Sequence, residues 1–315
     1  MKIFIAGHTG MVGSCMLQKL KEKTNEIITA NRKQLDLLNQ KDVFTFFKKN
    51  KFDLVIDCAA KVGGIYSNNL YRADFIYQNL QIQNNLIHAS YLNNVKKFLF
   101  LGSSCVYPKF AEQPIKEEYL LTSCLENTNE PYAIAKIAGI KMCESYYKQY
   151  GCDFISVMPT NLYGPNDNFH QLNAHVLPSL IHRFHVAKKN KIPFVDIWGT
   201  GRAKREFMYV EDMVEACLHV TEKIDAKTIY SENISHINIG SGIEVSIADL
   251  ANLIANLIQY EGEIKFDLSK PDGTLRKLLD TSRLNKLGYT SKITLEEGLK
   301  RTYNWYLKNE STINK

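Results

Sequence analysis

One tyrosine of the chain, Tyr132, is followed four residues later by a lysine, Lys136. Residues at i and i+4 share one face of a helix, so the phenol and the ammonium would lie side by side. Pro131 suits the first turn of a helix, which places the pair near a helix start. An unperturbed tyrosine has a pKa of about 10, and a neighbouring ammonium favours its phenolate form. The spacing therefore predicts a general acid that gives a proton to a substrate oxygen.

A serine lies where it could assist that proton transfer. The apolar run 98–101 reads as a buried strand, and it is followed by Gly102, Ser103, Ser104 and Cys105. In a parallel sheet the carboxyl end of a strand delivers its side chains to the cofactor crevice. We expect Ser103 to hydrogen-bond the substrate oxygen that Tyr132 protonates.

Three glycines follow the first apolar run of the chain. Gly7, Gly10 and Gly13 form the pattern G-x-x-G-x-x-G, and the stretch 11–23 after it has helical spacing. Glycines let the backbone turn sharply and approach a pyrophosphate, which then meets the free N–H groups of the helix start. A strand, this loop and a helix together predict a dinucleotide site.

The residues that follow the second apolar run indicate which dinucleotide is bound. An NAD site would place a carboxylate there, about 20 residues after the glycines, to accept from the ribose hydroxyls. This chain has Arg32 and Lys33 instead. A guanidinium binds a phosphate in bidentate fashion, so the sequence predicts NADP(H).

The elements that must position these residues alternate along the first half of the chain. Short apolar runs typical of buried strands occur at 2–6, 26–30, 54–59, 97–102 and 154–158, and helical spacing occurs at 75–92 and 132–150. This alternation predicts an α/β fold with a doubly wound, Rossmann-type parallel sheet. After residue 165 the pattern is irregular to about 205, and helical spacing returns at 210–220, 246–257 and 295–307. We expect a nucleotide-binding domain at 1–165, with a returning strand and helix from about 206–240, and a smaller α/β substrate lobe at 166–315.

The composition excludes several classes of protein. The chain has 315 residues, of which 45% are hydrophobic and 23% charged, which is typical of a globular protein and not of a disordered chain. No apolar run is long enough to cross a bilayer, and the start of the chain lacks the pattern of a signal peptide. The net charge of +6 is spread out, and the seven cysteines include no C-x-x-C pair. We expect a cytoplasmic protein with no metal site, no nucleic-acid partner and no membrane partner.

Longer motifs give a more specific resemblance. They are AAKVGGI at 59–65, LGSSCVYP at 101–108, NEPYAIAKIAGI at 129–140, MPTNLYGP at 158–165 and SKPDGT at 269–274. With the glycine loop and the Tyr132–Lys136 pair, they identify the chain as similar to the GDP-L-fucose synthase family, within the extended short-chain dehydrogenase/reductase superfamily. The resemblance extends from residue 2 to about residue 308.

The resemblance implies a two-part reaction on a GDP-4-keto-6-deoxy sugar. The family inverts C3 and C5 of the sugar and then reduces the C4 ketone with NADPH. Both inverted carbons flank the ketone, so their protons are acidified by it. By resemblance Cys105 is the base and His175 the acid, although a cysteine is a poor base unless its thiolate is favoured. Relatives are commonly homodimers through paired helices, and the segments 75–92 and 132–150 are the candidates here.

The resemblance also implies two sets of binding residues. The cofactor set contains Gly7, Thr9, Gly10, Met11, Val12, Gly13, Arg32, Asp36, Leu37, Ala59, Ala60, Leu101, Gly102, Lys136, Pro159, Asn161, Leu162 and His175. The substrate set contains Ser104, Arg183, Trp198, Arg205, Asp272 and Lys277.

Some positions depart from the family pattern and leave alternatives open. Thr9 stands where many relatives carry arginine, so a preference for NADPH would rest on Arg32. The stretches 65–72 and 171–174, which we expect near the sugar, differ in sequence from the corresponding stretches of the family. The alternative is a C4-reductase of another GDP-4-keto sugar, such as a heptose, with little or no epimerase activity. A more remote alternative is a non-catalytic NADPH sensor, which the intact Ser103, Tyr132 and Lys136 disfavour. A 4,6-dehydratase would want an acid pair where the chain has Ser104 and Cys105.

Overall fold

The computed structural model describes residues 1–22, 26–170, 173–270 and 272–313. Residue 23 of the expected first helix, residues 171–172 of the expected sugar loop and residue 271 of the SKPDGT motif lie outside the described residues.

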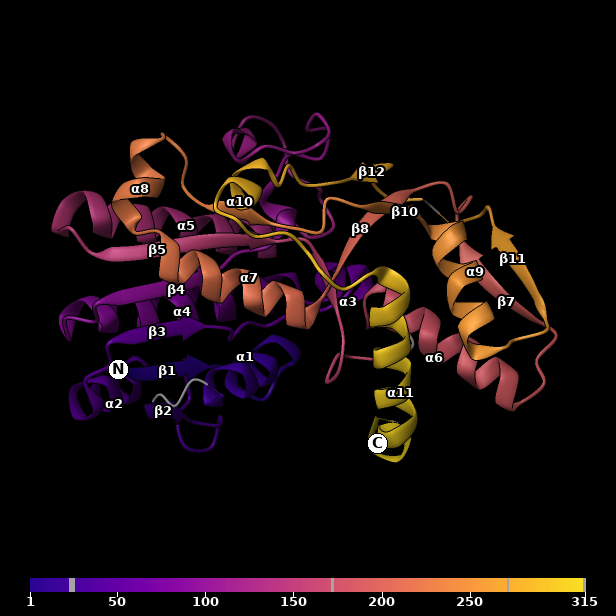
Figure 1. The fold of residues 1–315 in the computed structure, drawn as a ribbon, viewed down its shortest axis with the longest axis horizontal. Coiled ribbons are helices and arrows are strands. Elements are labelled where there is room, and N and C mark those ends of the chain that lie inside the picture. The colour runs from indigo at the N-terminus through magenta and orange to yellow at the C-terminus, as the bar shows by residue number, and fades with distance from the viewer. Residues whose placement is uncertain (23–25, 171–172, 271, 314–315) are drawn as a thin grey trace.

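A parallel sheet of six strands forms the larger part of the molecule (Figure 1). Its order is β2-β1-β3-β4-β5-β9, and each pair is parallel. The strands are β1 (Lys2–Ala6), β2 (Glu26–Thr29), β3 (Leu54–Asp57), β4 (Lys97–Leu101), β5 (Asp153–Pro159) and β9 (Ile237–Ile239). Both faces are covered by helices, which is why the strands are nearly continuous apolar runs. The expected doubly wound fold is confirmed.

Alternate residues of the strands pack into two hydrophobic cores, one on each face of the sheet. Ile3 and Ile5 point into a core with α1 (Met11–Lys21), α7 (Val210–Lys223) and α8 (Ala226–Ser231). Phe4 and Ala6 point into the other core, with α2 (Gln40–Asn50), α4 (Arg72–Leu92) and α5 (Glu130–Tyr150). The short helix α10 (Ser282–Lys286) adds Leu284 to the first core.

A smaller group of elements, drawn to the right in Figure 1, has its own core. Strand β8 (Lys204–Tyr209) pairs with β6 (Asn161–Tyr163), β10 (Glu244–Ser246) and β12 (Arg276–Lys277), and β7 (Phe194–Trp198) pairs with β11 (Glu263–Asp267). The core lies between these strands and the helices α6 (Val176–Lys189), α9 (Ile247–Ile258) and α11 (Leu295–Ile313). The short helix α3 (Ile65–Leu70) lies between the two groups of elements in the picture.

The stretch 166–205, whose sequence pattern is irregular, nevertheless contains the helix α6 and the strand β7. Leu177, Leu180, Ile181 and Phe184 of this helix are buried at the spacing of one helical face. Its other positions carry histidines, an arginine and lysines, and these polar residues obscured the apolar stripe in the sequence.

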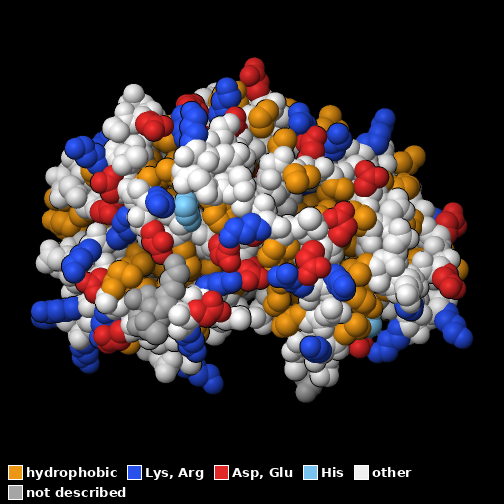
Figure 2. All heavy atoms as spheres, viewed as in Figure 1, with side chains coloured by type: hydrophobic (Ala, Val, Ile, Leu, Met, Phe, Trp, Pro, Cys, Tyr) orange, Lys and Arg blue, Asp and Glu red, His pale blue; other side chains and the backbone are white. Residues whose placement is uncertain are grey.

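The surface carries charges of both signs. Figure 2 shows Lys and Arg side chains interspersed with Asp and Glu over the visible face. Among the described residues, no helix is both long enough and apolar enough to cross a membrane. In the same part of the chain, no group of three or more His, Cys, Asp or Glu side chains could hold a metal ion.

Candidate active site

Helix α5 holds Tyr132 and Lys136 against the end of β4. The Nζ atom of Lys136 donates a hydrogen bond to the carbonyl oxygen of Leu101 at 2.9 Å and lies 4.8 Å from the centre of the Phe100 ring. The contact between helix and strand is tight, because a Cβ on Gly139 would lie 2.3 Å from that ring. The Lys136 Nζ atom is 5.9 Å from the centre of the Tyr132 ring. The Tyr132 and Lys136 side chains therefore lie near each other, as their spacing predicts.

The surroundings of Tyr132 favour the protonated form of its phenol. Burial raises its pKa well above the usual range, the Cys105 thiol raises it further, and a hydrogen bond with the Ser103 hydroxyl acts in the opposite direction. The Phe75 ring packs edge-on against the Tyr132 ring, with centroids 6.2 Å apart. Burial lowers the pKa of Lys136. A phenol that holds its proton is arranged to donate it to a substrate oxygen, and a Lys136 ammonium beside it would stabilise the phenolate that remains.

Ser103 and Cys105 belong to one tight turn at the end of β4. The 3₁₀ turn 104–106 begins after Ser103, whose hydroxyl accepts a hydrogen bond from the Cys105 N–H. Cys105 is buried, and burial raises the pKa of its thiol, while the positive charge of Lys277 is the largest opposing influence. Lys277 lies on β12, so a residue from the second half of the chain acts on this turn through its charge.

His175 precedes the first residue of α6 as its N-cap; its surface is exposed, although protein atoms surround much of the imidazole. Removal from water and the charge of Lys277 both lower the pKa of its imidazole, so the neutral form is favoured. Lys277 thus acts on both His175 and Cys105. Of the residues expected to be catalytic, Ser103, Cys105, Tyr132 and Lys136 are linked directly to one another, and His175 is linked to Cys105 through the charge of Lys277.

The glycine loop has the close backbone contacts that its sequence predicted. Gly7 has φ +75°, and its carbonyl accepts a hydrogen bond from the Gly10 N–H at 3.1 Å. A Cβ on Gly13 would lie 2.2 Å from the Gly7 carbonyl oxygen, so a side chain there would displace the loop. Helix α1 begins at Met11, and Thr9 and Gly10 are exposed at its start. This arrangement fits a pyrophosphate at the helix N-terminus.

The remaining expected cofactor residues lie after the carboxyl ends of β1, β2, β3, β4 and β5 or at those ends, and these five strands are consecutive in the sheet. Arg32 is exposed in the turn after β2, and the Asp36 carboxylate in the same segment accepts from the Leu38 N–H. Ala59 and Ala60 follow β3, Leu101 and Gly102 end β4, and Pro159, Asn161 and Leu162 surround the end of β5. Leu37 follows Asp36, and Val12 lies in the first turn of α1. Ligands of open α/β sheets bind at this edge.

The expected substrate residues form two groups. Arg205 on β8 is opposite Lys277 on β12, and Asp272 acts on the Arg205 guanidinium. The Asp272 carboxylate accepts from the Thr200 N–H at 2.7 Å and from its hydroxyl at 2.9 Å. In the second group, the Arg183 guanidinium donates to the carbonyl oxygen of Asp196, on the same strand as the exposed Trp198. Ser104 is buried in the turn after Ser103.

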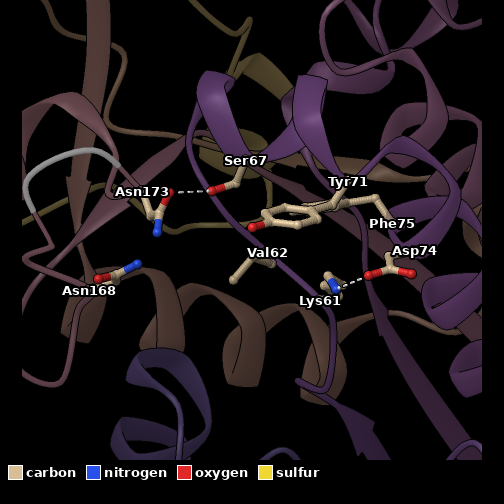
Figure 3. A pocket seen from close by; sticks show the side chains of 8 residues that line it. All are labelled: Lys61, Val62, Ser67, Tyr71, Asp74, Phe75, Asn168 and Asn173. Atoms are coloured by element: carbon tan, nitrogen blue, oxygen red, sulfur yellow. Dashed lines mark hydrogen bonds and ion pairs between the residues drawn. The ribbon is translucent and has the colours of Figure 1, made fainter.

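A polar pocket of about 290 Å³ adjoins this site (Figure 3). Its wall includes the Lys61–Asp74 ion pair, with 2.9 Å between Nζ and Oδ2, and the hydrogen bond from the Ser67 hydroxyl to the Asn173 side chain. Phe75, which packs against Tyr132, belongs to the same wall. The other lining residues are Val62, Tyr71 and Asn168. Sequence reasoning named the segments 65–72 and 171–174 but not the Lys61–Asp74 pair, whose partners are 13 residues apart.

Comparison with known proteins agrees with this geometry. The model of the NAD dependent epimerase/dehydratase family matches residues 3–240. The chain is 53% identical to GDP-L-fucose synthase of Escherichia coli, over 98% of this chain and 97% of the relative. It is 56% identical to GDP-L-fucose synthase 1 of Arabidopsis thaliana, over 98% and 94% respectively. The chain belongs to the GDP-L-fucose synthase family.

Solved structures of similar proteins extend the comparison. A GDP-6-OMe-4-keto-L-xylo-heptose reductase from C. jejuni is 40% identical, with a TM-score of 0.92 and 98% of each chain covered. A GDP-L-fucose synthetase from Naegleria fowleri, bound to NADP, is 28% identical, with a TM-score of 0.88 over 100% of this chain and 96% of that one. These findings confirm the expected family, its enzyme class of oxidoreductases and epimerases, and the NADP(H) cofactor.

Proposed function

We propose that this protein is a GDP-L-fucose synthase: it inverts C3 and C5 of GDP-4-keto-6-deoxy-D-mannose and reduces the C4 ketone with NADPH. One observation carries the proposal. It concerns Cys105 and His175, which a simple reductase does not need: the charge of Lys277 acts on both, and Cys105 and Ser103 both act on Tyr132.

In the reduction step, the bound NADPH supplies a hydride to C4. The Tyr132 hydroxyl gives its proton to the C4 oxygen, so that the C=O bond becomes CH–OH. Ser103 hydrogen-bonds the same oxygen and orients it toward the phenol. The Lys136 ammonium stabilises the phenolate that remains.

In each epimerisation step, the Cys105 thiolate removes the proton from a carbon next to the ketone, and the electron pair moves into an enolate. Ser103 and Tyr132 donate hydrogen bonds to the enolate oxygen. His175 returns a proton to the opposite face of the same carbon, which inverts it. Lys277 favours the thiolate of Cys105, and it also helps His175 to release a proton by lowering its pKa.

The two ends of the substrate would be bound by different groups. We assign the diphosphate to Arg205 and Lys277, with Arg183 as a further cation, and the guanosine to the exposed Trp198 and the Asp272 loop. We assign the 2′-phosphate of NADPH to Arg32 and the pyrophosphate to the glycine loop.

The proposal also includes a domain division at residue 165, a cytoplasmic location and a homodimer formed through α4 and α5.

A specific observation also favours the second candidate function, which is C4 reduction of a GDP-4-keto-heptose. Several solved relatives act on GDP-heptose sugars, and the polar pocket beside Phe75 could accept further hydroxyls. The curated relatives at 53% and 56% identity over nearly the whole chain favour the fucose reaction.

The test is NADPH oxidation by the full chain with GDP-4-keto-6-deoxy-D-mannose or a GDP-4-keto-heptose, followed by identification of the product. The expected result is faster turnover of the hexose and formation of GDP-L-fucose. A product that is reduced at C4 but not inverted at C3 and C5, or faster turnover of the heptose, would support the alternative. The UDP analogue of the hexose is the control for recognition of the guanosine.

A further inference from the structure

A buried carboxylate lies beneath the site and has no part in the steps above. Asp57 ends β3, and its exposed fraction is 1%. Its Oδ1 atom accepts a hydrogen bond from the Ala59 N–H at 3.0 Å. Its Oδ2 atom is buried, and no described residue hydrogen-bonds it. Such a group lowers the free energy of unfolding unless a nearby charge compensates it, so its presence calls for a physical reason.

The sheet register places this carboxylate on the same face as Lys136. Asp57 is paired with Phe100 of the neighbouring strand β4. The Phe100 ring lies between the sheet and α5, with the Lys136 Nζ atom 4.8 Å from its centre. Asp57 lies two residues after Val55 on the same strand, so both side chains point to the same face of the sheet. Val55 belongs to the core formed with α4 and α5. The carboxylate and the ammonium therefore share one water-excluded region.

The charged and titratable groups that act on Lys136 come from three elements. Asp57 and Cys58 come from the end of β3, and Cys105 from the turn after β4. Tyr132 lies one turn earlier on α5. Burial raises the pKa of both thiols, so neither places a negative charge beside Lys136 until Cys105 is deprotonated for the epimerisation step. Asp57 is the carboxylate among these groups and thus supplies the negative charge.

We propose that Asp57 is a positioning residue that keeps the Lys136 side chain in its ammonium form during turnover. The inference rests on the proposed function, because it concerns how that site sustains proton donation by Tyr132. Asp57 does not touch the substrate. It acts through Lys136, whose hydrogen bond to the Leu101 carbonyl fixes the position of the amine, and its own charge also raises the pKa of Tyr132, which keeps that phenol protonated until it donates.

The direction of each influence supports this role. Burial lowers the pKa of Lys136 and so favours the neutral amine, whereas Asp57 raises it. The influence is mutual: burial raises the pKa of Asp57 to about 6, and Lys136 opposes that rise. At neutral pH the carboxylate is therefore largely ionised. Without it, Lys136 would lose its proton at a lower pH, and Tyr132 would lose the positive neighbour that stabilises its phenolate.

The kinetic test compares pH profiles of kcat for NADPH oxidation in the wild type, Asp57→Asn and Asp57→Glu. In Asp57→Asn we expect the alkaline limb to move to lower pH by about one unit or more, and Asp57→Glu should restore most of the shift. The matched control is Asp212→Asn, since Asp212 is equally buried but is bonded to Ser291 and to the N–H groups of Lys292 and Ile293. It should lose stability and keep the wild-type profile. Identical profiles for Asp57→Asn and the wild type would overturn the proposal.

A second measurement needs neither substrate nor a folded Asp57→Asn variant. In protein labelled with ¹³C at aspartate carboxyls, the Asp57 signal is titrated in the wild type and in Lys136→Met. Loss of the ammonium should raise the pKa of Asp57, and an unchanged titration would overturn the inference. Failure of the wild type to oxidise NADPH with any GDP-4-keto sugar would instead reject the proposed function, and the carboxyl titration would still decide whether Asp57 and Lys136 are coupled.

Discussion

Gly64 and Ala174 touch through their backbones: a Cβ added to Gly64 would lie 2.5 Å from the carbonyl oxygen of Ala174. The Gly64 N–H also donates a hydrogen bond to the Asn173 carbonyl at 2.9 Å. The segment after β3 thereby fixes the backbone next to His175. Only a residue without a side chain fits at this contact, so the glycine sets the position of the candidate acid.

Gly64→Ala should displace the segment that carries His175. Because a misplacement of about 1 Å at a reacting group can lower a rate about a hundredfold, we expect exchange of the C3 and C5 protons to fall at least tenfold. Exchange is measured by NMR in D₂O. Ser67→Ala, which removes the hydrogen bond to Asn173 without adding bulk, should have a smaller effect. A wild-type exchange rate in Gly64→Ala would refute this role of the contact.

Tyr132→Phe removes the proposed proton donor and leaves the packing against Phe75 in place. We expect kcat for NADPH oxidation to fall at least a hundredfold, with little change in the dissociation constant of NADPH. The dissociation constant is followed by quenching of protein fluorescence. Tyr119→Phe, in a 3₁₀ turn where the hydroxyl bonds only to Glu112 among the described residues, is the matched control. Retained turnover in Tyr132→Phe would rule out this residue as the donor.

Arg32→Ala tests the origin of the NADPH preference. The exposed guanidinium should bind the 2′-phosphate, which NADH lacks, so the KM for NADPH should rise about tenfold while that for NADH stays unchanged. Lys33→Ala, at the adjacent exposed position, should have a weaker effect, since an ammonium lacks the bidentate geometry. An equal rise in the KM for both coenzymes would show that Arg32 supports the loop and does not bind the 2′-phosphate.

The sequence predicted the strand ends and the Tyr132–Lys136 pair because both depend on local patterns. Apolar runs marked the buried strands, and the i, i+4 spacing needs only one helix. The roles of Lys277 and Asp57 needed the three-dimensional arrangement. Lys277 reaches Cys105 across more than half the chain, and no short-range spacing records that approach. Asp57 did leave a signal: it is an acidic residue at the end of the apolar run 54–57, where a buried strand would have a hydrophobic residue.

The fold contains a histidine that makes stability depend on pH. His236 is fully buried, and its Nε2 atom is hydrogen-bonded to the Tyr107 hydroxyl at 2.5 Å. Burial lowers its pKa to about 3, whereas the unfolded chain binds the proton near the ordinary value of 6.5. The neutral ring therefore contributes its full stability above pH 6.5, and this contribution is lost as the pH falls toward 3.

The loss should amount to about 1.4 kcal/mol of unfolding free energy per pH unit within that window. The measurement is urea unfolding of the wild type and His236→Gln at several pH values. The difference in unfolding free energy between the two should shrink by this slope as the pH falls below 6.5. A difference independent of pH would mean that His236 titrates normally in the folded protein.

Whether one site both inverts and reduces the sugar is decided by proton exchange in the absence of coenzyme. The full chain is incubated with GDP-4-keto-6-deoxy-D-mannose in D₂O without NADPH, and deuterium at C3 and C5 is read by NMR and mass spectrometry. We expect incorporation at both carbons, abolished in Cys105→Ser and His175→Gln and retained in Cys124→Ser, which changes an exposed cysteine. NADPH oxidation by the same preparation with no deuterium at either carbon would contradict it.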